Sequence, residues 1–186
     1  YNATWNSRKG AAFGFSTIAA KAGDQLAPHL PKIIPKLYRY QYDPTPRIQQ
    51  SMASIWAALV PETQKTVDKF LPEILAELQK EVTSPQWRVR ESCCVALTEL
   101  LRGRTLETAT ETLTLLWQDI IRVMDDIKES VRQAAEKTAE ALSRVSIKMC
   151  DVSAGAKAGE AAVRAILPPL MEKGRNSGLT EVRDEV

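Results

Sequence analysis

The chain has 186 residues, of which 44% are apolar and 26% are charged, a balance that is typical of a folded protein and not of a disordered one. No stretch approaches the roughly 18 uninterrupted apolar residues of a membrane-spanning helix, so we expect no membrane insertion. The formal net charge is +2, and the basic excess is confined to residues 1–50, which carry seven Lys/Arg and two Asp/Glu.

A helix-start pattern recurs about every forty residues along the chain. It begins at Arg8, Ile48, Val89 and Val131, at intervals of 40 to 42 residues, and starts again at Val182. From Val89 apolar residues recur at the spacing i, i+4, i+7 and i+8, which places them on one face of a helix. Apolar stripes at helical spacing also follow Arg8, Ile48 and Val131, the last with one threonine in it. The pattern therefore predicts four helices that each bury one apolar stripe.

Further apolar stripes lie between these starts and predict the first helix of each pair. They cover residues 30–38, 67–82, 113–124 and 163–171. Five prolines fall in or near these stretches, namely Pro31, Pro35, Pro72, Pro168 and Pro169. Because proline lacks the N–H that a helix interior requires, we expect these helices to be kinked or to start late. No alternating run rich in Val, Ile and Thr predicts a strand.

Local signals mark the ends of several predicted helices. Ser84 followed by Pro85 predicts a helix N-cap, and Asp126 with Glu129 resembles a capping box. Gly103 follows an apolar stripe, where a left-handed C-cap favours glycine. Residues 150–159 are rich in small residues and lengthen the last interval, so we expect a loop there.

A period of about forty residues is typical of HEAT or armadillo repeats, which stack one-dimensionally on their neighbours. We therefore predict an all-α fold, an α-solenoid of HEAT-type antiparallel helix pairs with about four repeats. The predicted array covers residues 1–186, with units at roughly 1–23, 24–60, 61–103, 104–149 and 160–186. The chain starts at Tyr1 and ends on a repeat start, so we expect a segment of a longer protein.

Candidate catalytic and metal-binding groups are few. His29 is the single histidine, and no cysteine or histidine stands near it at a metal-ligand spacing. The three cysteines, Cys93, Cys94 and Cys150, form no CxxC pair and are predicted to be thiols in a reducing compartment, which argues against secretion. We therefore expect no enzyme activity, no metal and no cofactor.

Basic residues gather at the predicted starts of the second helices, and stacking of the repeats would align them along one edge. They are Arg8, Lys9, Arg47, Arg88, Arg90, Lys128, Arg132 and Arg183. These side chains either bond acids of the adjacent unit, such as Glu91 or Asp125, or contact an acidic partner. Arg88, Arg90, Lys128 and Arg132 are the candidate partner-binding residues of this group.

A second candidate is the aromatic and basic segment of residues 38–42. Interleaved aromatic and basic side chains stack on nucleic-acid bases or act as hot spots of protein interfaces. Tyr38 belongs to a buried stripe, which leaves Arg39, Tyr40 and Tyr42 as candidate partner contacts. The alternative is that both tyrosines pack against the next helical hairpin.

Three longer stretches carry a more specific resemblance. They read Trp-Arg-Val-Arg-Glu-Ser-Cys at residues 87–93, Leu-Leu-Arg-Gly-Arg at 100–104 and Asp-Asp-Ile-Lys-Glu-Ser-Val-Arg at 125–132. With further stretches over nearly the whole chain, the sequence resembles the large HEAT-repeat proteasome adaptor and scaffold family.

The resemblance implies a function that periodicity alone does not give. Members of that family are long solenoids without catalytic residues that bind the proteasome, link its core and regulatory particles, and act in its quality control. The resemblance therefore implies proteasome subunits as protein partners and a cytoplasmic and nuclear location. The alternatives are a transport-receptor-like HEAT protein that binds cargo and a nucleic-acid-binding HEAT protein that uses the basic first fifty residues, and the longer motifs disfavour nucleic acid.

Overall fold

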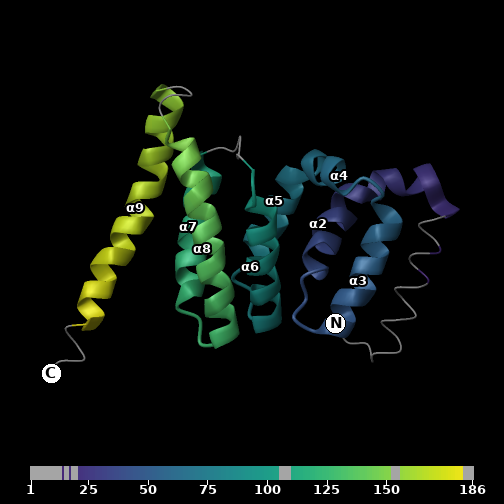
Figure 1. Cartoon of the computed structure of the whole chain (residues 1–186), viewed down its shortest axis with the longest axis horizontal. Helices are drawn as coiled ribbons and strands as arrows, with labels where there is room; N and C mark the ends of the chain where they lie inside the picture. Colours follow the sequence, from purple (N-terminus) through teal and green to yellow (C-terminus); the bar gives the residue numbers. More distant parts are fainter. Residues whose placement is uncertain (1–13, 15–16, 18–20, 105–109, 152–155, 182–186) are drawn as a thin grey trace. The chain divides into compact units, whose positions relative to one another are not determined.

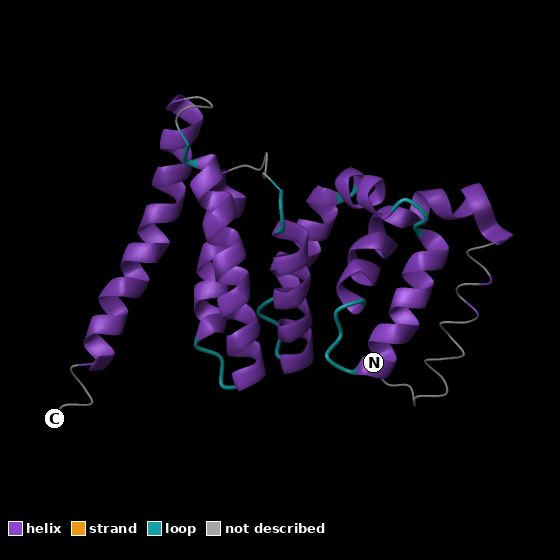
Figure 2. Cartoon of the chain, viewed as in Figure 1, coloured by secondary structure: helices purple, strands orange, loops and turns teal. Residues whose placement is uncertain are grey.

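The computed structural model of the chain describes residues 14, 17, 21–104, 110–151 and 156–181. These residues form helices and loops and no strand, which confirms the predicted all-α class (Figure 2). In chain order the elements are the 3-10 helix η1 (Gly23–His29) and the helices α2 (Leu30–Tyr40), α3 (Pro46–Leu59), α4 (Thr63–Lys69), α5 (Leu71–Glu81), α6 (Trp87–Leu101), α7 (Thr110–Met124), α8 (Glu129–Met149) and α9 (Ala156–Glu181) (Figure 1).

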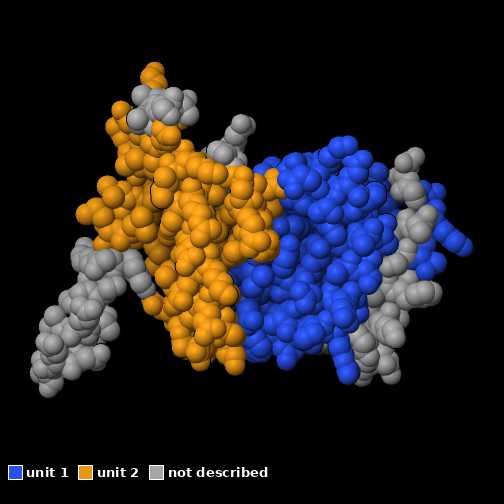
Figure 3. All heavy atoms as spheres, viewed as in Figure 1, with its two compact units in different colours: residues 1–96 blue, residues 97–186 orange. Residues whose placement is uncertain are grey.

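The helices group into two compact units, residues 1–96 (unit 1) and 97–186 (unit 2) (Figure 3). The division falls within α6. In unit 1, α2 packs against η1, α3 and α5, and α4 contacts α5. In unit 2, α7 packs against both α8 and α9, which also contact each other. The predicted repeat starts at Arg8 and Val182 lie outside the described residues, and the repeat boundaries stay predictions.

The predicted apolar stripes form the cores of the two units. In unit 2, Leu113 and Ile120 of α7 and Val131 and Leu142 of α8 are almost completely buried, at 1% exposure or less. In unit 1, the stripe of α5 is buried in the same way. Among the described helices, none combines the length and the apolar composition that crossing a membrane requires.

Prolines delay the start of two helices, as the sequence predicts. The segment before α2 forms η1 instead of an α-helix, and Pro31 occupies the first turn of α2. The stretch 67–82 is not one helix but two, because Phe70 leaves the helical region with φ −107° and ψ 20°. Pro72 then lies in the first turn of α5, where its missing N–H costs no hydrogen bond.

The predicted helix caps are correct at one place and displaced at two. Gly103 has φ +71° just after α6, the left-handed conformation that glycine adopts without strain. However, α6 begins at Trp87, two residues later than the Ser84–Pro85 signal predicts. The N-cap of α8 is Lys128, so Asp126 lies two residues before the cap position that the predicted capping box of Asp126 and Glu129 requires.

Pro169 lies inside α9 and leaves a carbonyl without its usual helical donor. In an α-helix the N–H of residue 169 would bond the carbonyl of Ala165, and proline has no N–H. The hydroxyl of Thr114 in α7 donates to that carbonyl oxygen at 2.9 Å. A side chain of one helix thus replaces a backbone bond that the neighbouring helix cannot make.

Replacing Thr114 with valine tests this bond. The Thr114→Val variant keeps the shape of the side chain but leaves the Ala165 carbonyl without the hydroxyl, so the free energy of unfolding should fall by about 1–2 kcal/mol. Urea denaturation measures the change. In a Pro169→Ala background the helix regains its own donor, and the cost of Thr114→Val should shrink; an unchanged cost there would contradict the compensation.

A charge in the core tests the burial of the stripes. The Val131→Asp variant places a carboxylate at a position with 0% exposure and should lower the free energy of unfolding by more than about 3 kcal/mol. Ile127→Asp is the matched control, since Ile127 is 96% exposed, and its effect should stay within about 0.5 kcal/mol. Equal thermal stability of the two variants would rule out the described packing of α8.

Candidate functional site

The loops that precede α3, α6 and α8 share one local fold. In each loop a side-chain oxygen accepts a hydrogen bond from the backbone N–H two residues later, which mimics a backbone turn. The three bonds join Thr45 N to Asp43 Oδ1 at 2.8 Å, Gln86 N to Ser84 Oγ at 3.4 Å, and Lys128 N to Asp126 Oδ1 at 2.9 Å. Ser84 and Asp126, which signal a cap in the sequence, therefore shape the loop before the helix.

An arginine in the first turn of α6 and of α8 fixes the loop in front of it. Arg90 Nη1 donates to the carbonyl oxygens of Ser84 and Pro85 at 2.8 and 3.0 Å. Forty-two residues later, Arg132 Nη1 donates in the same way to those of Asp126 and Ile127, at 2.8 and 3.3 Å. These contacts differ from the predicted bonds to acids of an adjacent unit.

The helix α3 has a glutamine where α6 and α8 have this arginine. Gln49 stands in register with Arg90 and Arg132 and is exposed. Glutamine has no charge and a shorter side chain than arginine. The arginine contact is therefore a property of the loops before α6 and α8. The loop before α3 shares only the side-chain turn with them.

Where each arginine-held loop meets its helix, an apolar side chain is exposed beside a cation, and in unit 1 these are the first two residues of α6. In unit 1, Trp87 is 37% exposed and the Cζ atom of Arg88 lies 5.3 Å from the centre of its ring. In unit 2, Ile127 is 96% exposed and is followed by the exposed Lys128. We call these two pairs the loop tips. They hold two of the predicted partner-binding residues, Arg88 and Lys128, at the surface, whereas Arg8, Lys9 and Arg183 lie outside the described residues.

The tyrosines of residues 38–42 take part in packing. Tyr38 is 5% exposed, and its ring meets those of Tyr42 and Trp56 edge to face, with centroids 5.5 and 5.7 Å apart. Tyr40 and Tyr42 are both half-buried. The alternative that these side chains pack within the helical array therefore fits their positions better than an open contact surface.

Arg39 lies in the interior. Its charge is therefore not at the surface, contrary to the prediction that Arg39 contacts a partner. The residue is 3% exposed, and Nη1 donates to Ser92 Oγ of α6 at 3.1 Å. Its guanidinium also lies 4.5 Å from the centre of the Tyr40 ring. Cys93 follows Ser92 in α6. Burial raises the pKa of its thiol, and the positive charge of Arg39 opposes that rise.

The described residues offer little to a metal ion or a nucleophilic mechanism. His29 is exposed at the end of η1, and no three His, Cys, Asp or Glu side chains of the described ranges are placed to hold a metal. None of the three cysteines forms a disulfide, and Cys93 and Cys94 are buried.

A further group of basic side chains lies in unit 2, away from the helix starts. Lys137, Arg144 and Lys148 follow one another at i, i+7 and i+11, so their shared face of α8 is readable from the sequence. Their proximity to Arg102 and Arg104, after the end of α6, is a result of the fold. These five cations line one groove.

Comparison with known proteins gives a family and several relatives. A family model described as "Stalled ribosome sensor GCN1-like, HEAT repeats" matches residues 11–153. The chain is 56% identical over 183 residues to the human protein named proteasome adapter and scaffold protein ECM29. It is 40% identical over 204 residues to the Drosophila melanogaster protein named proteasome-associated protein ECM29 homolog, and 36% identical over 193 residues to Proteasome component ECM29 of Saccharomyces cerevisiae.

The lengths of these proteins differ greatly. Each of the three alignments covers 98% of the chain but only 10% or 11% of the relative. The chain thus spans about a tenth of the length of the curated relatives that it matches.

Removal of one loop-holding arginine tests its structural role. In Arg132→Gln the charged donor to two carbonyls is lost, so the free energy of unfolding should fall by about 1.5 kcal/mol. Arg144→Gln is the control, because Arg144 forms an exposed pair with Glu140 at 3.5 Å and its loss should cost no more than about 0.5 kcal/mol. Chemical denaturation of both variants measures the difference, and equal losses would show that Arg132 does not hold its loop.

Proposed function

Because the chain belongs to the GCN1-like HEAT-repeat family, we propose that it is a segment of a proteasome scaffold that acts by binding and not by catalysis. The observation that carries this proposal is the similarity, over nearly the whole chain, to proteins from three organisms that are named for the proteasome. We further propose that the longer protein links the core and regulatory particles of the proteasome and that this segment contributes to its helical array.

The loop tips are the part of the segment that we assign to partner contact. Side-chain turns and the arginines Arg90 and Arg132 hold these loops, so binding needs little further ordering of the chain. Each tip combines an apolar side chain with a cation, and an interface uses both kinds of contact. Arg88 and Lys128 are therefore the residues that we expect to touch a protein partner.

The same considerations support the proposed absence of enzyme activity and the proposed location. The relatives in human and fly carry names of adapters, scaffolds and associated proteins, which favours binding over catalysis. Three cysteines without a disulfide suit a reducing compartment, and we propose the cytoplasm and the nucleus. The transport-receptor-like and nucleic-acid-binding alternatives have no comparable support among these relatives.

Capture of purified proteasomes by the immobilised chain tests the proposal. We expect proteasome subunits to be retained and crosslinks to fall on residues at or next to Arg88 or Lys128. Parallel incubations with purified ribosomes and with single-stranded DNA separate the alternatives. Retention of either one without retention of proteasomes would contradict the proposal.

A charge-reversal pair tests the loop tips themselves. Arg88→Glu combined with Lys128→Glu should weaken proteasome retention about tenfold or more, because two attractive charges become repulsive. The matched control is Lys32→Glu combined with Lys157→Glu, which changes one exposed lysine in each unit by the same charge. If the control weakens binding as much as the loop-tip pair, the tips are not the contact.

A further inference from the structure

A groove of about 710 Å³ lies in unit 2 between α8 and the C-terminal end of α6. Its floor is apolar, since Leu101, Ala141 and Val145 line it and are 7% exposed or less. Ile147 lines the groove as well and is 71% exposed. The groove therefore offers apolar surface at its base and at one side.

The fold concentrates positive charge around this groove. Residues 101–150 contain eight Lys/Arg and eight Asp/Glu, which makes the segment neutral as a whole. Within the described part of this segment, five of the eight cations line the groove but only one of the seven acids, Glu140. The cations are Arg102, Arg104, Lys137, Arg144 and Lys148. A neutral stretch of sequence thus becomes a strongly basic surface.

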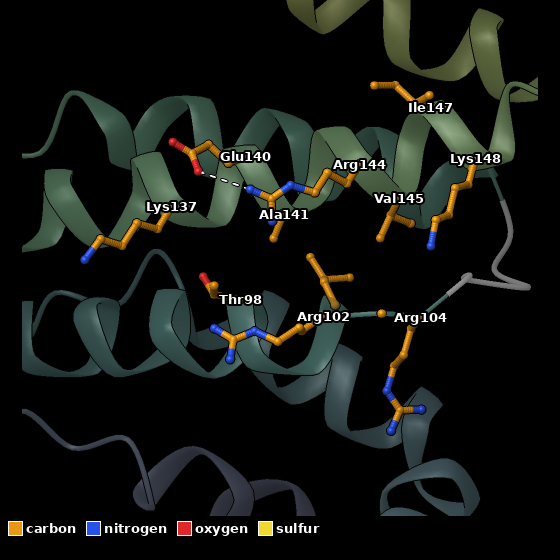
Figure 4. Close-up of a pocket in the computed structure, with 12 residues that line it drawn as sticks. Thr98, Arg102, Arg104, Lys137, Glu140, Ala141, Arg144, Val145, Ile147 and Lys148 are labelled. Atoms are coloured by element: carbon orange, nitrogen blue, oxygen red, sulfur yellow. Dashed lines mark hydrogen bonds and ion pairs between the residues drawn. The ribbon is translucent and has the colours of Figure 1, made fainter.

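The acids close to these cations do not neutralise the groove. Glu140 pairs with Arg144 at 3.5 Å, but both side chains are about 70% exposed, and such pairs contribute little. Glu99 of α6 pairs at 2.8 Å with Arg102, which follows the end of that helix, and not with a cation of α8. In Figure 4, Lys137 and Lys148 lie toward opposite ends of the α8 face, with the Arg144–Glu140 pair between them. Basic charge therefore remains along the whole length of this face.

We propose that this groove binds an acidic peptide segment of a partner protein. From Lys137 to Lys148 the helix advances about 17 Å, at 1.5 Å per residue, which matches about five residues of extended peptide. Carboxylates of the peptide pair with Lys137 and Lys148, and its apolar side chains lie on Leu101 and Val145. The ligand class is an extended segment that mixes Asp or Glu with aliphatic residues.

The lining favours a peptide over nucleic acid. Single-stranded nucleic acid is bound by aromatic side chains that stack on its bases along a basic groove. None of the side chains that line this groove is aromatic. A phosphate backbone would use the cations but would leave the apolar floor without a partner, whereas a mixed acidic and apolar peptide uses both.

Fluorescence anisotropy with the 186-residue chain tests the proposal. The probe is a labelled peptide of about six residues that alternates Glu with Leu. Lys137→Glu combined with Lys148→Glu should weaken its binding at least about tenfold, because two attractive contacts become repulsive. The matched control is Lys157→Glu combined with Arg164→Glu on α9, which changes the net charge equally at exposed positions outside the groove and should leave binding within about twofold.

Two further probes decide the class of ligand. A peptide with Ser in place of Leu should bind at least several-fold more weakly, because it leaves the floor empty, and equal binding would overturn the mixed character of the ligand. Oligodeoxythymidine of equal charge should bind more weakly than the Glu-Leu peptide. If oligodeoxythymidine binds as tightly as the peptide or more tightly, and its binding depends on Lys137 and Lys148, the groove is a nucleic-acid site. If the groove variant and the control variant lose the same peptide affinity, binding depends on net charge and not on the groove.

Circular dichroism of every variant keeps the result interpretable, since the four substituted side chains are exposed and the variants should stay folded. The inference does not rest on the proposed function. The peptide assay contains no proteasome, so a failure of proteasome capture does not change its result. A failure of the peptide to bind likewise does not change the result of proteasome capture.

Discussion

No helix of this chain can bury its own apolar stripe, and the rest of the structure depends on that constraint. In unit 2 the stripe of α7 is covered by α8 and α9 together, and in unit 1 α2 is covered by α3, α5 and η1. Once the helices are fixed against each other, the loops between them are fixed as well. Short loops of this kind need only one turn-forming side chain and, before α6 and α8, one arginine to hold a defined shape.

Polar groups inside the stripes set the register between helices. The hydroxyls of Thr98 and Thr138 lie 3.1 Å apart between α6 and α8, and Trp117 Nε1 donates to Ser146 Oγ at 3.0 Å between α7 and α8. A shift of α7 along α8 would leave the indole N–H of the buried Trp117 without this acceptor, which costs more than an apolar mismatch, and a shift of α6 along α8 would break the contact between Thr98 and Thr138. The helices α6 and α8 supply the walls of the basic groove, and the contact between Thr98 and Thr138 joins these two walls.

The sequence predicts the helices because a stripe at 3.6-residue spacing is a local property, and the structure confirms those of α5, α7 and α8. The burial of Arg39 was not predictable, because its partner Ser92 is 53 residues away and belongs to another stripe. Spacing also marks Arg90 and Arg132 as equivalent, but their acceptors are backbone carbonyls. Because every residue has such a carbonyl, the sequence does not identify the acceptors. The groove escapes prediction for a related reason, since a neutral segment gives no sign of how its charges separate.

The hydroxyl of Thr114 has a consequence that reaches beyond this one chain. Thr114 and Pro169 lie 55 positions apart, yet the value of the first depends on the presence of the second, because the carbonyl that connects them lacks a donor only when residue 169 is proline. Selection would therefore act on the two positions jointly. In lineages where another amino acid replaces the proline, position 114 is released to drift toward alanine or valine, and in lineages that keep the proline a hydroxyl should persist.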